Sequence, residues 1–185
     1  PEPGNFELLT KNIRINNFTN IEAIPKAVSD KHGHLKLYIN TLEQGMHSVI
    51  QHESGSPALE VEAISINEYF VNTTYLIDII KMDIEGAEII ALGGMKNVIN
   101  KNDRLLLFTE FWPEGLQHAG ATALDYYNSL TNVGFKYIYL IDESHKTFKQ
   151  AEYDDIIKGC FTRLYKTPCH VNLLCSKNAL DTSLV

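Results

Sequence analysis

Two stretches of the chain alternate apolar and polar residues with the period of a half-buried β-strand. The first covers Leu35 to Ile39, and the second runs from Leu59 to Ile66. Residues 40–58, between them, hold two glycines, a proline and several serines, which is the composition of a loop. The pattern therefore predicts a β-hairpin that encloses a long loop.

Other apolar runs do not alternate. Leu76–Met82 and Arg104–Phe111 are nearly continuous, as expected of strands covered on both faces, so we predict that they are parallel neighbours at the centre of a sheet. Phe135–Ile141 and His170–Cys175 predict two further strands, with a polar excursion between them. A short strand is also expected from Ile21 to Ile24, before Pro25.

Helical spacing occurs between these strands. Asn67 is expected to cap a short helix that ends at Phe70. Longer helices are predicted from three patterns: Phe6, Leu9 and Ile13 after an N-cap at Asn5; the face formed by Ala87, Ala91, Met95 and Val98; and Thr122–Val133, ended by Gly134. Strands that alternate with helices indicate an α/β fold with a parallel centre.

Composition limits the functional classes. A chain of 185 residues with 44% hydrophobic residues is expected to form one globular domain over residues 1–185. The net charge is −7 and lysine and arginine form no cluster, which argues against nucleic-acid binding. No apolar run approaches the roughly 18 residues that a membrane span needs.

Cysteine usage indicates a reducing compartment. Cys160, Cys169 and Cys175 do not have zinc-site spacing, and an odd number of cysteines leaves no closed set of disulfides. We expect buried or unreactive thiols and a cytoplasmic protein.

Charge is concentrated where the run Leu76–Met82 ends. Asp83 and Glu85 follow it directly, and Gly86 permits a tight turn into the next helix. Ligands of parallel α/β sheets bind beyond the carboxyl ends of the strands, so these carboxylates are well placed to meet one. The alternative is structural: Glu85 and Glu88 would then only complement the helix dipole.

The segment from Ile77 to Met95, IDIIKMDIEGAEIIALGGM, resembles the signature of the FkbM-like methyltransferases. The first nine residues, PEPGNFELL, are similar to the E-P-x-P-x-N-F-x-x-L segment of that family. Residues 27–39 resemble the strand end, turn and hairpin that follow, and Arg104–Phe111 resembles the next strand, which ends in a glutamate. The resemblance covers nearly the whole chain.

This resemblance implies a Rossmann-like class I methyltransferase sheet, mostly parallel, with an antiparallel C-terminal strand and the inserted β-hairpin. It also implies S-adenosylmethionine as cofactor and methylation of a hydroxyl on a sugar, lipid or secondary metabolite. The family's first strands and glycine-rich turn would precede Pro1, so we expect the chain to lack them and to hold the later two-thirds of the catalytic domain.

The resemblance also nominates site residues. Glu2 lies near the position for the ribose hydroxyls, and Ala27 and Val28 are expected against the adenine. Many relatives place a histidine two residues after the strand-end glutamate; here that residue is Trp112, and the nearest histidine is His118. The candidates are Asp83, Glu85, Glu110 and His118 for catalysis, and Glu2, Ala27, Val28 and Asp83 for the cofactor.

Alternatives remain open at this point. Converging carboxylates can also hold a divalent cation, although no metal site is predicted. Trp112, Tyr126 and Tyr127 can line a pocket for a small-molecule or glycan acceptor, while packing is the alternative for the two tyrosines. Asp83-Ile84-Glu85 can instead be the metal-binding pair of a nucleotide-sugar glycosyltransferase, and a non-catalytic domain on the same fold is the third interpretation.

Overall fold

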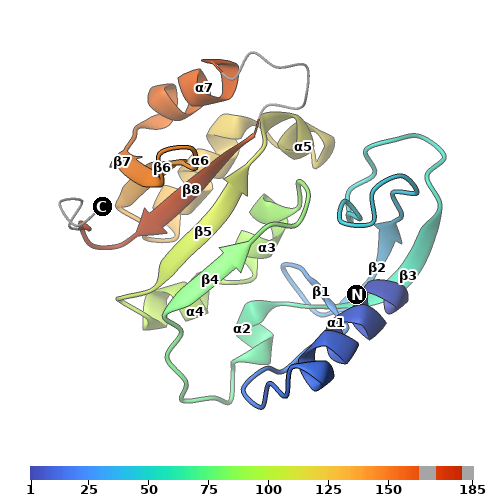
Figure 1. Ribbon diagram of the computed structural model, residues 1–185. Helices are drawn as coiled ribbons and strands as arrows, with labels where there is room; N and C mark the ends of the chain where they lie inside the picture. The colour runs from blue at the N-terminus through green and yellow to red at the C-terminus, as the bar shows by residue number, and fades with distance from the viewer. Residues whose placement is uncertain (163–169, 181–185) are drawn as a thin grey trace.

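The computed structural model describes residues 1–162 and 170–180 and shows an α/β protein with two mixed sheets (Figure 1). The strands are β1 Ala27–Val28, β2 Gly33–Tyr38, β3 Ala58–Ile64, β4 Ile79–Met82, β5 Leu106–Phe111, β6 Tyr137–Asp142, β7 Thr147–Gln150 and β8 Val171–Ser176. The helices are α1 Pro3–Ile15, α2 Ile66–Tyr69, α3 Glu88–Gly93, α4 Lys96–Lys101, α5 Pro113–His118, α6 Ala123–Asn132 and α7 Tyr153–Thr162.

The larger sheet has the strand order β4-β5-β8-β6-β7. Strands β4 and β5 are parallel neighbours, as predicted, with Met82 opposite Thr109. The other three pairings are antiparallel, so this sheet is mixed and not mostly parallel. The alternation of burial along β5 places one of its faces in the core.

The prediction that Leu76–Met82 lies at the sheet centre is wrong. Strand β4 begins only at Ile79 and forms the edge of the described sheet, paired on one side by β5. Leu76 and Ile79 are 71% and 60% exposed. A continuous apolar run therefore does not distinguish a covered strand from one that presents apolar side chains at an edge.

The smaller sheet confirms the predicted hairpin. Strands β2 and β3 are antiparallel, and β1 pairs with β3 in parallel. Residues 39–57 connect β2 to β3 as a loop, in which Ser48 forms an isolated bridge with Tyr38 at the end of β2. A small core of Ala27, Leu37, Val61 and Ala63 stabilises this sheet. The strand expected at 21–24 is not formed; the chain pairs only at β1, after Pro25.

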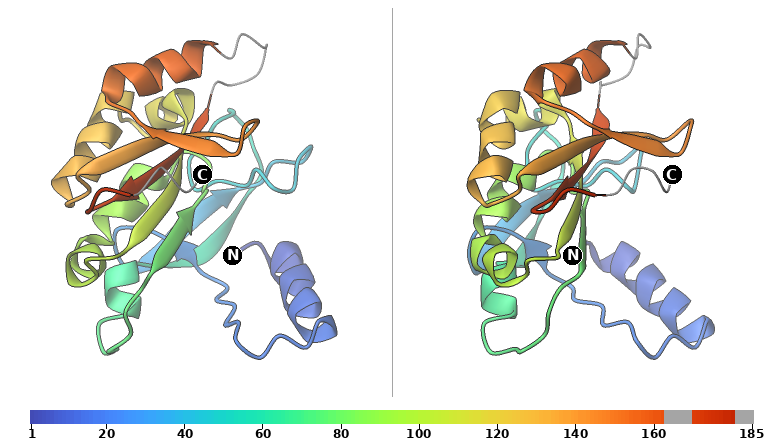
Figure 2. Two further views of the ribbon diagram at one scale, coloured as in Figure 1. Left: turned by 60° about the vertical axis from the view of Figure 1, so that its left-hand side comes forward. Right: turned by 90° about the vertical axis from the view of Figure 1, so that its left-hand side faces the viewer.

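Helices α3, α4 and α6 lie on one face of the larger sheet (Figure 2). The face predicted for Ala87, Ala91, Met95 and Val98 is buried there, but it belongs to two short helices separated at Gly94. Helix α1 stands apart from the sheets in both views and buries none of its residues.

Helix boundaries were predicted less accurately than helix positions. Helix α1 begins at Pro3, because the carboxylate of Glu2 accepts from the Asn5 amide at 2.6 Å; Asn5 is therefore not the N-cap. Ser65 caps α2 in a capping box with Glu68, whereas Asn67 accepts from Asn97 and Val98 and so caps α4. Helix α6 agrees with its prediction, with Thr122 as N-cap and Gly134 at φ +113° after its end.

The polar excursion before β8 contains β7 and α7, and α5 follows β5 directly; none of these elements was predicted. Cys160 and Cys175 are buried, while Cys169 lies outside the described residues. Among the helices of residues 1–162 and 170–180, none has the length and apolar character required to cross a bilayer.

Candidate functional site

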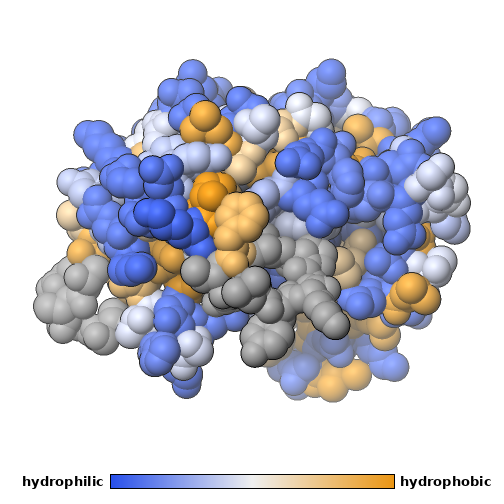
Figure 3. Space-filling view, turned by 90° about the horizontal axis from the view of Figure 1, so that it is seen from above, coloured by the Kyte–Doolittle hydropathy of each residue, from blue (hydrophilic) through white to orange (hydrophobic). Residues whose placement is uncertain are grey.

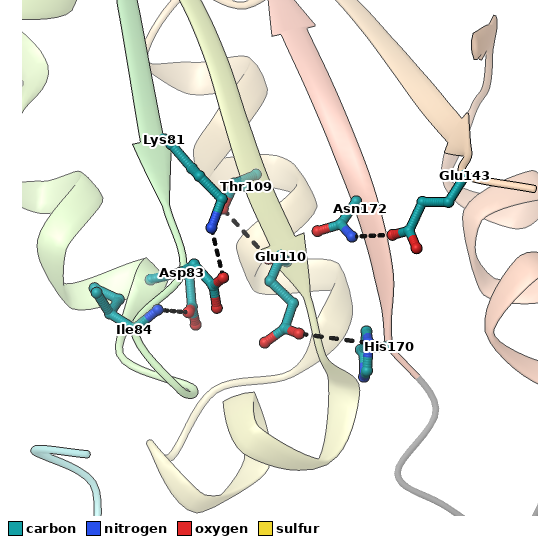
Figure 4. Close-up of polar contacts among 9 residues, drawn as sticks. Lys81, Asp83, Ile84, Thr109, Glu110, Glu143, His170 and Asn172 are labelled. Atoms are coloured by element: carbon teal, nitrogen blue, oxygen red, sulfur yellow. Dashed lines mark hydrogen bonds and ion pairs between the residues drawn. The ribbon is translucent and has the colours of Figure 1, made fainter. Parts of the chain in front are cut away.

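The end of β4 and the end of β5 bring acidic residues together. Because Met82 pairs with Thr109, the next residues, Asp83 and Glu110, follow at adjacent strand ends (Figure 4). Lys81 donates to Asp83 at 2.6 Å and forms an ion pair with it. The edge of the sheet thus carries two carboxylates from neighbouring strands, as the sequence predicted.

The turn after β4 has an unusual backbone. Glu85 adopts φ +56°, which is uncommon for a residue with a side chain, and Gly86 follows at φ +91°. Inside the turn, the carboxylate of Glu88 is buried and accepts from the amide of Ile84 at 3.0 Å. Burial raises the pKa of Glu88. Glu88 is therefore an internal support of this turn.

Two loop groups hold the Glu85 carbonyl. The hydroxyl of Ser48 donates to it at 2.7 Å, and Nε2 of His52 lies 2.9 Å from it. Burial, and next the negative charges of Asp83 and Glu88, raise the pKa of the Glu85 carboxyl. The loop after β2 therefore holds the strained backbone of Glu85, whose carboxylate is one of the candidate catalytic groups.

A first cleft of about 270 Å³ lies between the turn, β1 and the start of α1. It gathers five of the nominated residues, from three separate parts of the chain: Glu2, Ala27, Val28, Asp83 and Glu85. Leu37 and Val49 add apolar wall, and Lys26, Gln44 and His47 add polar groups. All four nominated cofactor residues are therefore brought together in one cavity.

A second cleft of about 490 Å³ lies on the other side of the loop, towards α5. Glu85 lines both clefts. Residues 46–50 form a wall between them, because Met46, Ser48 and Ile50 line the second cleft while His47 and Val49 line the first.

Figure 3 views the molecule from the end that carries α7, where hydrophilic side chains predominate and apolar ones occur in small groups.

His118 lies in the second cleft, at the end of α5 and not in a loop. Its Nδ1 lies 2.8 Å from Nδ1 of His52, whose ring also packs against Trp112 with centroids 5.0 Å apart. Trp112 lines this cleft, as one prediction proposed, and its indole nitrogen is buried with no hydrogen-bond partner in the described part of the chain.

Glu110 lines neither cleft in the described structure. Its carboxylate lies 3.7 Å from Nε2 of His170 (Figure 4). Burial, followed by the negative charges of Glu85 and Asp83, raises the pKa of Glu110 to about 7. Glu110 is thus poised to exchange a proton near neutral pH, but from a place beside the two clefts.

The tyrosines follow their packing alternative. Tyr126 is fully buried and shares a 2.6 Å hydrogen bond with Thr109, while Tyr127 donates to Glu152 at 2.9 Å. Sequence reasoning missed His47, Ser48 and His52, which lie in a loop without periodicity. Within residues 1–162 and 170–180, no three His, Cys, Asp or Glu side chains are grouped as a metal ion would require.

Carboxylates at parallel strand ends beside two clefts are the arrangement in which α/β proteins bind ligands. The family model described as the Methyltransferase FkbM domain matches residues 1–137. The chain therefore belongs to the FkbM methyltransferase domain family, as its sequence motifs indicated.

A solved structure agrees in fold. The crystal structure of methyltransferase FkbM from Methylobacillus flagellatus KT superposes with a TM-score of 0.54 at 16% sequence identity. The match covers 95% of this chain and 34% of that protein, so the chain spans about a third of its length. A search of curated proteins gave no match.

Proposed function

We propose that this chain is the part of an S-adenosylmethionine-dependent O-methyltransferase that binds the cofactor in the first cleft and the acceptor beside Glu85. The observation that carries the proposal is the convergence of Glu2, Ala27, Val28 and Asp83 on one cavity, together with the family match. We also propose that residues 1–185 act as one domain and that both sheets belong to one Rossmann-like methyltransferase fold.

The first cleft fits the chemistry of this cofactor. Ala27, Val28 and Val49 offer an apolar wall to a flat purine, and the carboxylates of Glu2 and Asp83 suit ribose hydroxyls and a sulfonium charge. Glu2 already accepts from the Asn5 amide, but a carboxylate has about four lone-pair sites and can accept further bonds. A volume of about 270 Å³ suits the adenosine portion better than a whole drug-sized ligand.

When bound, S-adenosylmethionine supplies a methyl carbon attached to a positively charged sulfur. The protein then needs to align the acceptor hydroxyl and remove its proton. A bound cofactor would supply the methyl group and retain the electron pair of its carbon–sulfur bond, and the proton of the acceptor hydroxyl would pass to a side chain of this site. Glu85 lines both clefts and has a raised pKa, so we propose it as the proton acceptor, with Asp83 aligning the reactants.

Binding of cofactor to the full-length protein tests this function. Calorimetry with S-adenosylmethionine should give a dissociation constant in the micromolar range. Glu2→Gln should weaken binding by about tenfold or more, because hydrogen bonds to a charged group contribute about 1.5–3 kcal/mol each. Glu7→Gln is the matched control, since Glu7 is exposed on the same helix and outside the cleft.

The alternatives give different results in the same assay. Absence of binding at millimolar cofactor, or equal binding by the Glu2→Gln variant, contradicts the proposed cleft. Binding of a nucleotide sugar that requires manganese would instead favour the glycosyltransferase interpretation. Cofactor binding without any methyl transfer to an acceptor panel would favour the non-catalytic domain.

A further inference from the structure

We propose that the second cleft binds the methyl acceptor, and that this acceptor is an uncharged, polyhydroxylated ligand such as a sugar residue of a glycan or glycoside. The assignment as acceptor rests on the function proposed above. The nature of the ligand rests on the side chains of the cleft itself: His52, His118, Trp112 and its carboxylates.

The hydrogen bonds define where the protons of the two histidines lie. The carbonyl oxygen of Glu85 can only accept, so His52 must carry its proton on Nε2, 2.9 Å away. In a neutral ring the Nδ1 of His52 is then an acceptor, and its 2.8 Å neighbour, Nδ1 of His118, must donate to it.

In a neutral His118 ring, the proton on Nδ1 leaves Nε2 without one. That nitrogen has no hydrogen-bond partner among the described residues, and His118 lines the cleft. It therefore offers a lone pair to a donor, and a hydroxyl group is such a donor. His52 is the positioning residue, held by Glu85 on one side and by the ring of Trp112 on the other.

The remaining polar groups also suit hydroxyls. The ring of Trp112 lines the cleft and adds an aromatic surface, while its indole N–H is buried and has no partner in the described part of the chain. Glu85 accepts a second hydroxyl at the wall shared with the first cleft. A ligand with several neighbouring hydroxyls can satisfy His118 and Glu85 together, which a ligand with one hydroxyl cannot.

The charge of the cleft argues against an anionic ligand. Glu53, Glu85 and Glu114 line it, and its described lining contains no lysine or arginine. Three carboxylates without a cation create a negative potential, which repels phosphate and carboxylate groups. We therefore expect discrimination between a neutral sugar and its phosphorylated or acidic form.

The ligand can be tested without cofactor, because Trp112 lines this cleft and is the single tryptophan of residues 1–185, so the tryptophan emission that is lost in Trp112→Phe reports on this cleft. The full-length protein is titrated with methyl glycosides of common hexoses, with the corresponding hexose 6-phosphates and uronic acids, and with a simple phenol. At least one neutral glycoside should change the emission and bind at least tenfold more tightly than its anionic counterparts. Equal or tighter binding of an anionic form, binding of the phenol alone, or no binding by any glycoside would overturn the proposal.

Two variants and one spectroscopic measurement test the histidines. His118→Phe should abolish the glycoside response, whereas His34→Phe, at an exposed position of β2, should leave it unchanged. Nitrogen-15 imidazole shifts should show His52 protonated on Nε2 and His118 protonated on Nδ1, and His52→Ala should remove that preference from His118. Protonation of His118 on Nε2 in the wild-type protein would contradict the proposal, whether or not the protein binds the cofactor.

Discussion

Gly86 lies directly against the backbone of Gly115, so closely that a Cβ atom added at Gly86 would be 2.9 Å from the Gly115 carbonyl oxygen. This contact joins the turn after β4 to helix α5 and so places Glu85 beside the second cleft. Both partners are glycines because neither side has room for a side chain: a Cβ at Gly115 would overlap the ring of Trp112.

Gly86→Ala should therefore destabilise the protein by about 2–4 kcal/mol, from the positive φ and the overlap together. Gly120→Ala is the matched control, since Gly120 has φ +79° but open space around its Cβ, and should cost only about 1–2 kcal/mol. Urea unfolding measures both. Equal losses of unfolding free energy in the two variants would show that the backbone at Gly115 moves to make room for the added methyl group.

The Glu110 carboxyl should make stability depend on pH. Its pKa rises from the ordinary 4.5 to about 7 in the folded protein, so folding favours the protonated form. Its contribution is complete below pH 4.5 and is lost as pH rises through about 7. The stability advantage of wild type over Glu110→Gln should fall across this window by about 1–2 kcal/mol, after allowance for solvent screening.

Chemical denaturation at several pH values measures this difference. Glu114→Gln, which changes an exposed carboxylate on α5, is the control and should show a flatter profile. If the difference between wild type and Glu110→Gln were constant with pH, the environment of Glu110 would be less acidic and less buried than the structure indicates.

Asp83→Asn should lower methyl-transfer turnover by about 10²–10⁴, the usual cost of losing a well-placed acid or base. Its unfolding free energy should change by less than about 1 kcal/mol, because the ion pair with Lys81 is exposed. Turnover is measured with labelled cofactor. Lys81→Met removes the partner of Asp83 and should change turnover by about fivefold at most; unchanged turnover in Asp83→Asn would exclude its role.

The Thr109–Tyr126 hydrogen bond should show coupling in a double-mutant cycle. Both hydroxyls are buried and lie 2.6 Å apart between β5 and α6. Tyr126→Phe or Thr109→Val leaves one buried hydroxyl without this partner and should cost about 1–2 kcal/mol. The double variant should cost less than the sum by about 1 kcal/mol. Additive losses would indicate that the remaining hydroxyl finds another partner.

Local chemistry determined which features could be predicted from the sequence. Helix α6 begins after Thr122 and ends before Gly134, and both signals involve only neighbouring residues. The position of the carboxylates after Met82, at a strand end, could be predicted from the strand that precedes them. The position of β4 in the sheet depends on which strands pair with it, and an apolar run does not show which strands those are. The place of His52 depends on Glu85, Trp112 and His118, which are distant in sequence, so no local pattern could reveal it.

The wall formed by residues 46–50 has a consequence for protein engineering. Substitutions at Met46 or Ile50 change the lining of the second cleft, and substitutions at His47 or Val49 change that of the first. The lining of the proposed acceptor cleft can therefore be varied at Met46 and Ile50 while that of the proposed cofactor cleft is left intact. An insertion or deletion of one residue has a different effect, because it shifts the alternation within residues 46–50 and so exchanges which side chains line the two clefts. Within this short segment, length is thus under a tighter constraint than residue identity.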